Sequence, residues 1–262
     1  MMTLGKVFLV GAGPGDPGLL TLKARDLIAA AGCVIYDHLV NPEILAHAPP
    51  GAELIYAGKQ RGKCAMRQET INALLVAKAS EQAIVVRLKG GDPFIFGRGG
   101  EEAEALVDAG IQYEIVPGVS AGAAVAAYAG IPITHRDLSS SVAFVTGHED
   151  PGKSESTINW PHLAIGVDTI VFFMGVGNLR EIANKLIRHG RDPATPVAVI
   201  QWGTYQQQRT HVCDLAGIAE HAIREQIKPP AMIVVGEVVR LRDKLKWIEE
   251  LAIEDCRMKI AE

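Results

Sequence analysis

The sequence predicts an α/β protein in which strands and helices alternate along the chain. Short Val/Ile-rich runs end at a Gly or Pro break and are followed by longer Ala/Leu-rich segments, which is the order of strand and helix in this class. The run 83–88 (AIVVRL) is apolar nearly throughout, as a strand covered on both faces should be. We therefore expect a mainly parallel sheet in the first half of the chain.

The expected elements follow this alternation in order. Strands are predicted at 7–11, 33–36, 83–88, 113–116, 142–146, 169–173, 197–201 and 231–235. Helices are predicted near 19–31, 68–80, 99–109, 120–129, 177–189, 214–225 and 240–251. The segment 130–141 (GIPITHRDLSSS) interrupts the pattern with a proline and a serine run, so it is the best candidate for a linker. We expect an N-terminal domain at 1–134 and a C-terminal domain at 139–262.

The composition is that of a globular protein with enough apolar residues to form a core. The chain has 262 residues, of which 48% are hydrophobic. The N-terminal run 1–13 lacks a cleavage-site pattern and is too short to span a bilayer, so we expect a cytoplasmic protein without membrane contact. A net charge of −4 argues against a general nucleic-acid binder. The four cysteines are scattered and predicted to be reduced, and the eight histidines show no metal-ligand spacing, so no metal site is expected.

The first glycine turn, 7–18 (VFLVGAGPGDPG), resembles a dinucleotide-binding fingerprint, and Asp37 ends the next strand as such a fold would require. The full GxGxxG pattern needs a glycine at position 16, where the chain has Asp16. Pro14 has no N–H to donate to a pyrophosphate. The turn fits a rigid wall beside a ligand without phosphate better than it fits a nicotinamide or flavin cofactor. A dinucleotide-dependent oxidoreductase is the alternative from another class.

The second turn, 87–102 (RLKGGDPFIFGRGGEE), follows the apolar strand. Gly90 and Gly91 leave bare backbone at the carboxyl end of that strand, where open α/β sheets place their ligands. Asp92 can accept hydrogen bonds from a ligand's hydroxyl or ammonium groups, or it can act as a turn residue, which is common for Asp-Pro.

The third turn, 116–122 (VPGVSAG), repeats this design: a strand, a Pro-Gly break, small residues and an Ala-rich helix. Ser120 stands in the position of an N-cap for that helix. Because three small-residue turns follow successive strands, we expect them to form one shared cleft.

Further distinctive strings occur in order along essentially the whole chain. Besides the three turns they are 34–40 (VIYDHLV), 57–63 (AGKQRGK), 127–136 (AYAGIPITHR), 145–150 (VTGHED), 158–160 (INW) and 229–242 (PPAMIVVGEVVRLR). Together they resemble the uroporphyrinogen-III C-methyltransferases, which are tetrapyrrole methylases. The resemblance implies two α/β domains with the active site in the cleft between them, and a homodimer.

The resemblance also implies a function. Such an enzyme uses S-adenosylmethionine to methylate uroporphyrinogen III at C-2 and then C-7, giving precorrin-2 through precorrin-1, with S-adenosylhomocysteine as the second product. The product could enter the biosynthesis of sirohaem, cobalamin or haem d1. Another tetrapyrrole or precorrin methyltransferase of the same fold is the alternative. A noncatalytic module that binds the cofactor is a third hypothesis. The cofactor-binding positions implied are Pro14, Gly90, Gly91, Asp92, Ile95, Ser120, Ala121, Met174 and Gly203.

A polycarboxylate substrate of this kind needs a cationic pocket, preferably with arginines that pair with carboxylate through two hydrogen bonds. Cations gather near the turns: Lys59, Arg61, Lys63 and Arg67 in one loop, Arg87, Lys89 and Arg98 at the second turn, and His135 and Arg136 at the linker. We expect substrate binding by Arg61, Lys63, Arg67, Arg98, Glu101 and Arg136.

The predicted catalytic residues are Asp37, Lys59 and Arg98. Asp37 and Lys59 match the proton acceptor and proton donor of the family. An alternative within the family gives the base role to Arg98, with Glu101 beside it. Because the unperturbed pKa of arginine lies above about 12, Arg98 is a poor base unless its surroundings hold it neutral, and we expect it to anchor the substrate.

Overall fold

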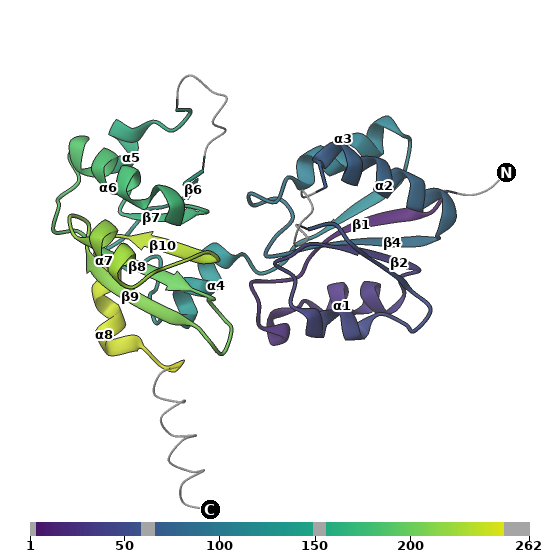
Figure 1. Ribbon diagram of the computed structural model, residues 1–262, viewed down its shortest axis with the longest axis horizontal. Helices are drawn as coiled ribbons and strands as arrows, with labels where there is room; N and C mark the ends of the chain where they lie inside the picture. Colours follow the sequence, from purple (N-terminus) through teal and green to yellow (C-terminus); the bar gives the residue numbers. More distant parts are fainter. Residues whose placement is uncertain (1–3, 59–65, 149–155, 249–262) are drawn as a thin grey trace, which may run out of the picture. The chain divides into compact units, whose positions relative to one another are not determined.

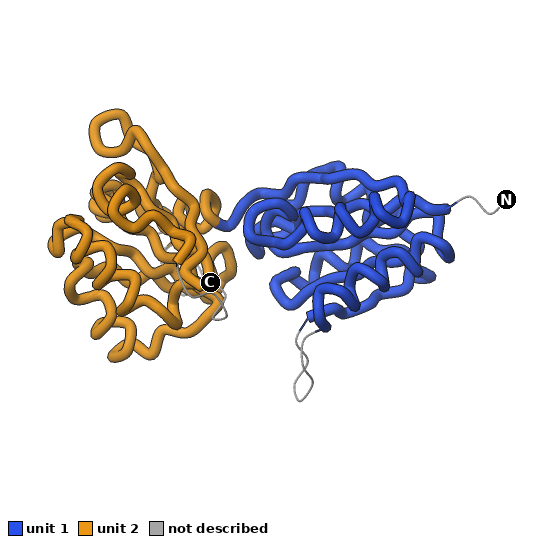
Figure 2. Tube along the Cα trace, turned by 90° about the horizontal axis from the view of Figure 1, so that it is seen from above, with its two compact units in different colours: residues 1–121 blue, residues 122–262 orange. Residues whose placement is uncertain are grey.

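The computed structural model describes residues 4–58, 66–148 and 156–248. The chain divides into two compact units, residues 1–121 and 122–262, coloured blue and orange in Figure 2. Within the described residues, each unit contains one five-stranded sheet with buried apolar side chains around it. The two-sheet α/β architecture predicted from the sequence is thereby confirmed.

The first unit alternates strands and helices around a parallel sheet (Figure 1). Its elements are β1 (Lys6–Gly11), η1 (Pro17–Leu19), α1 (Leu22–Ala29), β2 (Cys33–Tyr36), η2 (Pro42–His47), β3 (Glu53–Tyr56), α2 (Gln68–Glu81), β4 (Ile84–Lys89), α3 (Gly99–Asp108) and β5 (Tyr113–Val116), where η marks a 3-10 helix. The strands pair in the order β3-β2-β4-β1-β5, and these pairings are parallel, as expected.

Helices cover both faces of this sheet: α2 and α3 lie on one face and α1 on the other (Figure 1). Successive residues of a strand point to opposite faces. In β4, Val85 packs in the cluster of the α2 and α3 face, whereas Val86 and Leu88 pack in the cluster of the α1 face. Arg87 and Lys89 alternate with these two, so they lie on the face that α2 and α3 cover.

The second unit is built on a mixed sheet. Its elements are α4 (Ala121–Tyr128), β6 (Val142–Thr146), α5 (Trp160–Gly166), β7 (Thr169–Phe173), η3 (Val176–Asn178), α6 (Leu179–Arg188), β8 (Pro196–Gln201), β9 (Arg209–Asp214), α7 (Ile218–Arg224), β10 (Ala231–Val235), η4 (Glu237–Leu241) and α8 (Arg242–Leu245). The strand order is β6-β7-β10-β8-β9. The β6–β7 pair is parallel, while β10 runs antiparallel to β7 and β8, and β9 runs antiparallel to β8.

The two units divide between Ala121 and Gly122, at the start of α4. This helix packs within the second unit. A Cβ on Gly122 would lie 2.9 Å from ring atoms of Phe144 and Phe173, and one on Gly203 would lie 2.3 Å from Val125. Small residues on α4 therefore let it lie directly against the second sheet and its loops.

The segment predicted as a linker, 130–141, is fastened to the second unit by hydrogen bonds. Asp168 Oδ2 accepts from the backbone N–H of Ser140 at 2.8 Å and of Ser141 at 3.0 Å. The hydroxyls of Ser139 and Thr169 are 2.7 Å apart. The serine run thus supplies donors that tie this segment to the start of β7, and the domain limits 1–134 and 139–262 stay a prediction.

Several elements differ from the sequence-based expectation. The helix predicted near 214–225 begins at Ile218, because β9 runs to Asp214, and the one predicted near 240–251 is the end of η4 followed by the short α8, which ends at Leu245. The strands β3 and β9 and the helix α5 were not predicted. Glu53, Leu54 and Val212 of the two strands are exposed, since β3 and β9 each lie at one edge of a sheet, and α5 is short with Pro161 in its first turn. The predicted helix 19–31 begins later, at Leu22, because the Thr21 side chain accepts from the Ala24 N–H and caps it there.

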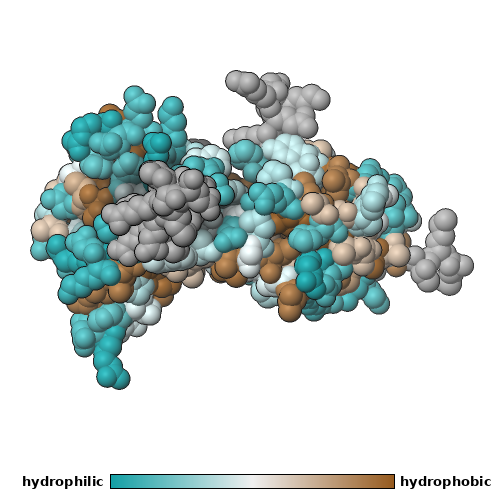
Figure 3. Space-filling view, turned by 90° about the horizontal axis from the view of Figure 1, so that it is seen from below, coloured by the Kyte–Doolittle hydropathy of each residue, from teal (hydrophilic) through white to brown (hydrophobic). Residues whose placement is uncertain are grey.

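Exposed apolar side chains are distributed over many elements of both units, among them Leu22, Val107, Ile165 and Ile223. On the face drawn in Figure 3, hydrophobic and hydrophilic residues are interspersed over both units. In the part of the chain that the structure describes, no helix is long and apolar enough to cross a membrane.

Replacing Leu9 by Ala should lower the free energy of unfolding by about 2–5 kcal/mol, because a buried side chain is lost from the central strand β1 and a cavity remains. Urea unfolding followed by circular dichroism measures this. The matched control is Leu22→Ala, since Leu22 is 71% exposed, and it should change the free energy by less than about 0.5 kcal/mol. Equal losses in the two variants would contradict the burial of β1.

Candidate active site

The three glycine turns meet at the carboxyl ends of β1, β4 and β5. Gly91 N–H donates to the Gly13 carbonyl at 2.7 Å, and Gly13 N–H donates to the Gly91 carbonyl at 3.2 Å. A Cβ on Gly118 would lie 2.3 Å from the Gly91 oxygen, and one on Gly11 would lie 2.5 Å from the Gly118 Cα. No side chain fits at these contacts, so glycine is required for the backbones to approach each other.

Asp92 fixes the second turn and joins it to the third. Its Oδ1 accepts from the Phe94 N–H at 2.8 Å, and its Oδ2 accepts from the Gly118 N–H at 3.1 Å. This is the turn-residue role that the sequence allows for Asp92. A carboxylate has about four lone-pair sites, so Asp92 can accept further hydrogen bonds from a ligand while holding the two turns together.

The segment that leads from Asp92 into α3 is a compact turn. Gly97 and Gly99 pass so close to the Pro93 carbonyl that Cβ atoms there would lie 2.7 Å and 2.4 Å from its oxygen. Phe96 and Arg98 adopt left-handed backbone conformations, with φ of 52° and 59°. Side chains of this turn, including those of Phe96 and Arg98, are exposed at the edge of the sheet where the glycine turns meet.

Asp37 lies directly after β2, at the same edge of the sheet. Its Oδ1 accepts from the Leu39 N–H at 3.0 Å, and its Oδ2 lies 3.7 Å from Nη2 of Arg87. The side chain of Asp37 is 27% exposed, whereas that of Arg87 is 4% exposed. The predicted proton acceptor is therefore accessible to solvent on one side and paired with a buried cation on the other.

Arg87 and Lys89 do not face solvent, although the sequence placed them among the substrate-facing cations. Both side chains are buried and bind Oε1 of Glu102, at 3.0 Å from Arg87 Nε and 2.8 Å from Lys89 Nζ. Burial lowers the pKa of Lys89, and the charge of Arg87 lowers it further, against the opposing effect of Glu102. The physical reason for the difference is the strand alternation, which directs both cations beneath α3.

Arg98 and Glu101 form an exposed pair joined by two hydrogen bonds, Nε to Oε1 at 2.8 Å and Nη2 to Oε2 at 2.7 Å. The hydrogen bond from Glu101 raises the pKa of the Arg98 guanidinium above its usual range. Arg98 in turn lowers the pKa of Glu101. An arginine whose pKa is raised stays charged, so the geometry favours the anchoring role of Arg98 over that of a base.

The remaining predicted site residues lie in different surroundings. Lys59, Arg61 and Lys63 lie outside the described residues. Arg67 and Arg136 are exposed, while Pro14, Ile95 and Ser120 are half-buried around the glycine turns, and Ala121 begins α4. In the second unit, Met174 follows β7 with a left-handed φ of 55° and a 56% exposed side chain, and Gly203 packs against α4.

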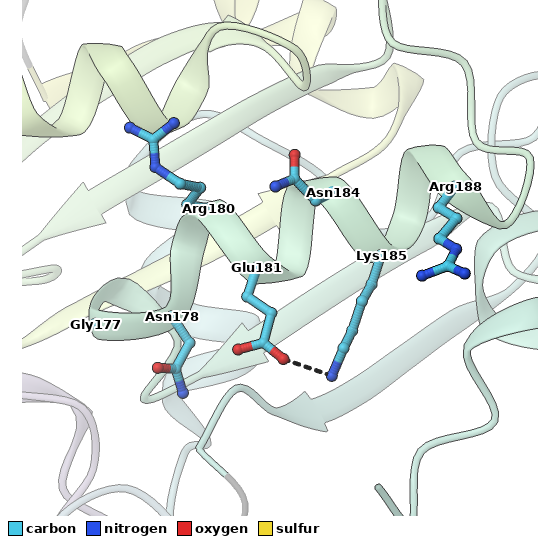
Figure 4. A pocket seen from close by; sticks show the side chains of 7 residues that line it. All are labelled: Gly177, Asn178, Arg180, Glu181, Asn184, Lys185 and Arg188. Carbon is cyan, nitrogen blue, oxygen red and sulfur yellow. Dashed lines mark ion pairs between the residues drawn. The ribbon is translucent and has the colours of Figure 1, made fainter.

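A separate surface hollow lies along α6 (Figure 4). It is lined by Gly177, Asn178, Arg180, Glu181, Asn184, Lys185 and Arg188. Lys185 and Glu181 are paired there at 2.8 Å, one turn of the helix apart. The hollow is formed by residues of η3 and of the α6 helix that follows it, and it contains none of the predicted site residues. Among the described residues, no group of three or more His, Cys, Asp or Glu side chains could hold a metal ion.

The first unit is thus an α/β domain in which the carboxyl ends of the parallel strands carry the glycine turns and Asp37, where a small ligand can reach them. Residues 6–219 match the family model of the tetrapyrrole (corrin/porphyrin) methylases. The chain belongs to this family, which confirms the resemblance inferred from its sequence strings.

Individual relatives support this assignment. The chain is 52% identical over 253 residues to a uroporphyrinogen-III C-methyltransferase of Bacillus subtilis, covering 96% of this chain and 98% of the relative. It is 55% identical over 241 residues to an S-adenosyl-L-methionine-dependent uroporphyrinogen III methyltransferase of Methanosarcina barkeri, covering 92% and 94%. A crystal structure of uroporphyrin-III C-methyltransferase from Thermus thermophilus with S-adenosyl homocysteine matches with a TM-score of 0.78 and 42% identity, covering 90% of this chain and 100% of that one.

Replacing Gly118 by Ala should lower the free energy of unfolding by about 1–3 kcal/mol, because the added Cβ cannot be placed without separating the turns. The melting temperature of the variant measures this. The matched control is Gly100→Ala in α3, where a Cβ meets nothing within 4 Å. Alanine is favoured over glycine in a helix by about 1 kcal/mol, so this variant should melt no lower than the parent protein. The reverse order would contradict the packing of the turns.

Proposed function

We propose that this chain catalyses methyl transfer from S-adenosylmethionine to uroporphyrinogen III, at C-2 and then at C-7. The observation that carries the proposal is the meeting of the three glycine turns, which leaves bare backbone beside Asp92 at the carboxyl edge of a parallel sheet. The near full-length similarity to uroporphyrinogen III methyltransferases supports this choice of substrate.

The cofactor is proposed to contact the glycine turns of the first unit. Pro14, Gly90, Gly91, Asp92, Ile95, Ser120 and Ala121 belong to these turns or directly adjoin them. The second unit carries the other proposed cofactor residues, Met174 and Gly203. The cofactor supplies an activated methyl group on a sulfonium centre. The N–H groups of Gly13, Gly91 and Gly118 are bonded within the turns, but their carbonyl oxygens keep a second lone pair and no side chain shields the backbone from a ligand.

Positioning is expected to provide most of the catalysis, because methyl transfer needs an in-line approach of the acceptor carbon. Arg98 with Glu101, together with Arg67, Arg136 and the loop residues Arg61 and Lys63, is proposed to hold the carboxylates of the macrocycle. After each methyl transfer the macrocycle must lose a proton. We assign the acceptor role to Asp37 and the donor role to Lys59.

The assembly is proposed to be a cytoplasmic homodimer, as the family resemblance and the composition of the chain lead us to expect.

Incubation of the purified protein with methyl-labelled S-adenosylmethionine and enzymatically made uroporphyrinogen III should place label on the tetrapyrrole at C-2 and C-7. Mass spectrometry of the macrocycle measures the transfer, and calorimetric titration with S-adenosylhomocysteine and with NADPH serves as the control for cofactor class. Binding of S-adenosylhomocysteine without transfer of label would leave only a noncatalytic module. Binding of NADPH in its place would favour the oxidoreductase alternative.

Replacing Arg98 by Ala should raise the KM for uroporphyrinogen III about tenfold, since a charge-assisted pair with a carboxylate contributes about 1.5–3 kcal/mol. The dissociation constant of S-adenosylhomocysteine should stay unchanged. The matched control is Arg240→Ala, because Arg240 is also exposed and pairs at 2.8 Å with a glutamate three residues away, Glu237. A parallel loss of cofactor affinity in the Arg98 variant would show that the turn itself had been disrupted.

A further inference from the structure

A continuous ionic network lies beneath α3 in the first unit. It links Asp37, Arg87, Glu102 and Lys89 through the contacts given above. The side chain of Glu102 is fully buried, those of Arg87 and Lys89 nearly so, and Asp37 is the member that reaches solvent. The formal charges of two cations and two carboxylates cancel, so the network is neutral as a whole.

Burial of these charges is not explained by stability. The free energy needed to remove two ions from water often exceeds the free energy gained from their attraction when buried. A protein with apolar side chains of similar volume in their place is often at least as stable. Val85, the preceding residue of β4 on the same face, is apolar and fully buried. The lowered pKa of Lys89 is a further sign that its charge is held there against the cost of burial. A role other than packing is therefore needed for this network.

The network fixes the plane of the Arg87 guanidinium. Nε donates to Glu102, while Nη1 donates to the Leu88 carbonyl at 3.0 Å and lies 3.4 Å from the Ile35 carbonyl. With these groups held, Nη2 is directed towards Oδ2 of Asp37. The other oxygen of Asp37 is held by the Leu39 N–H. One carboxylate oxygen of Asp37 is thus fixed by a hydrogen bond, and the other faces the charge of Arg87 across an ion pair of 3.7 Å.

Glu102 is the centre of this arrangement. Its Oε1 accepts from Arg87 and Lys89, and Nε2 of Gln68 in α2 lies 3.3 Å from the same oxygen. Its Oε2 is buried without a hydrogen-bond partner among the described residues. Buried polar atoms are nearly always paired, so a carboxylate held by one oxygen is a costly arrangement that calls for a functional explanation.

We propose that Glu102 and Arg87 are positioning residues for Asp37: Glu102 holds the Arg87 guanidinium, which aims the Asp37 carboxylate at the proton that the macrocycle loses. The inference rests on the proposed function, in which Asp37 accepts this proton. In that step the bond to the proton breaks, its electron pair stays with the macrocycle, and the proton passes to a carboxylate oxygen of Asp37. Glu102 and Arg87 contact neither substrate nor cofactor in this account.

The test begins with Glu102→Gln, which keeps the size of the side chain and removes its charge. The value of kcat should fall about tenfold or more, because a misplacement of about 1 Å can cost about 100-fold in rate. The KM for uroporphyrinogen III and the affinity for S-adenosylhomocysteine should stay within about twofold of the parent protein, because binding groups are untouched.

The matched control is Glu114→Gln. Glu114 in β5 is also a carboxylate bound by two cations, in its case Lys6 and Lys23, and Lys6 begins β1 at the opposite edge of the same sheet. Its replacement should leave kcat unchanged. A wild-type kcat in Glu102→Gln, or an equal fall in both variants, would overturn the proposal.

A double-mutant cycle distinguishes a positioning role of Glu102 from a general disruption of the site. If Glu102 acts through Asp37, Glu102→Gln should cause no further fall in kcat when Asp37 is already replaced by Asn. Independent, multiplying effects would overturn the proposal. Should Glu102→Gln fail to fold, Arg87→Lys replaces it in the same cycle, since it keeps the charge and loses the fork that reaches both carboxylates. Absence of methyl transfer by the parent protein would instead overturn the proposed function.

Discussion

The close approach of Gly11, Gly91 and Gly118 is the constraint on which the candidate site depends. A Cβ on Gly11 would lie 2.5 Å from the Gly118 Cα and one on Gly118 would lie 2.3 Å from the Gly91 oxygen, so neither position admits a side chain. Gly91 has a left-handed φ of 69° that favours glycine. Asp92 secures the convergence by accepting an N–H from the third turn. The edge of the sheet therefore presents backbone polar groups and a few directed side chains, such as Asp37, to a ligand.

The strands of both sheets were largely predictable because their centres are buried. Runs such as β1, β4 and β10 are covered on both faces and consist of apolar residues almost without interruption. The strands β3 and β9 escaped prediction because half of their residues are exposed, including the apolar Leu54 and Val212, so neither strand alternates a buried apolar face with an exposed polar one. β5 and β6 are edge strands too, and they were predicted because most of their residues are apolar.

The convergence of the turns was also predictable, since parallel strands bring their carboxyl ends to one edge. The burial of the two cations Arg87 and Lys89 was not predicted. Arg87 and Lys89 read as solvent-facing charges beside a turn, although their alternation with Val86 and Leu88 already placed them on the opposite face from these residues. The signal that was missed is that both faces of β4 are covered, so a charge on either face must be buried and must find a partner.

That partner comes from α3, where two adjacent glutamates bind two different arginines. Consecutive residues of a helix point about 100° apart, so Glu101 faces outward to Arg98 while Glu102 faces the sheet and Arg87. The outward pair is exposed and can exchange its partner for a substrate carboxylate. The inward pair is buried, so in the proposed reaction its geometry does not depend on contact with the substrate. The first turn of α3 can thus serve the proposed reaction in two ways. Glu101 leaves Arg98 able to bind a carboxylate of the substrate, and Glu102 helps to orient Asp37, which accepts the proton that the macrocycle loses.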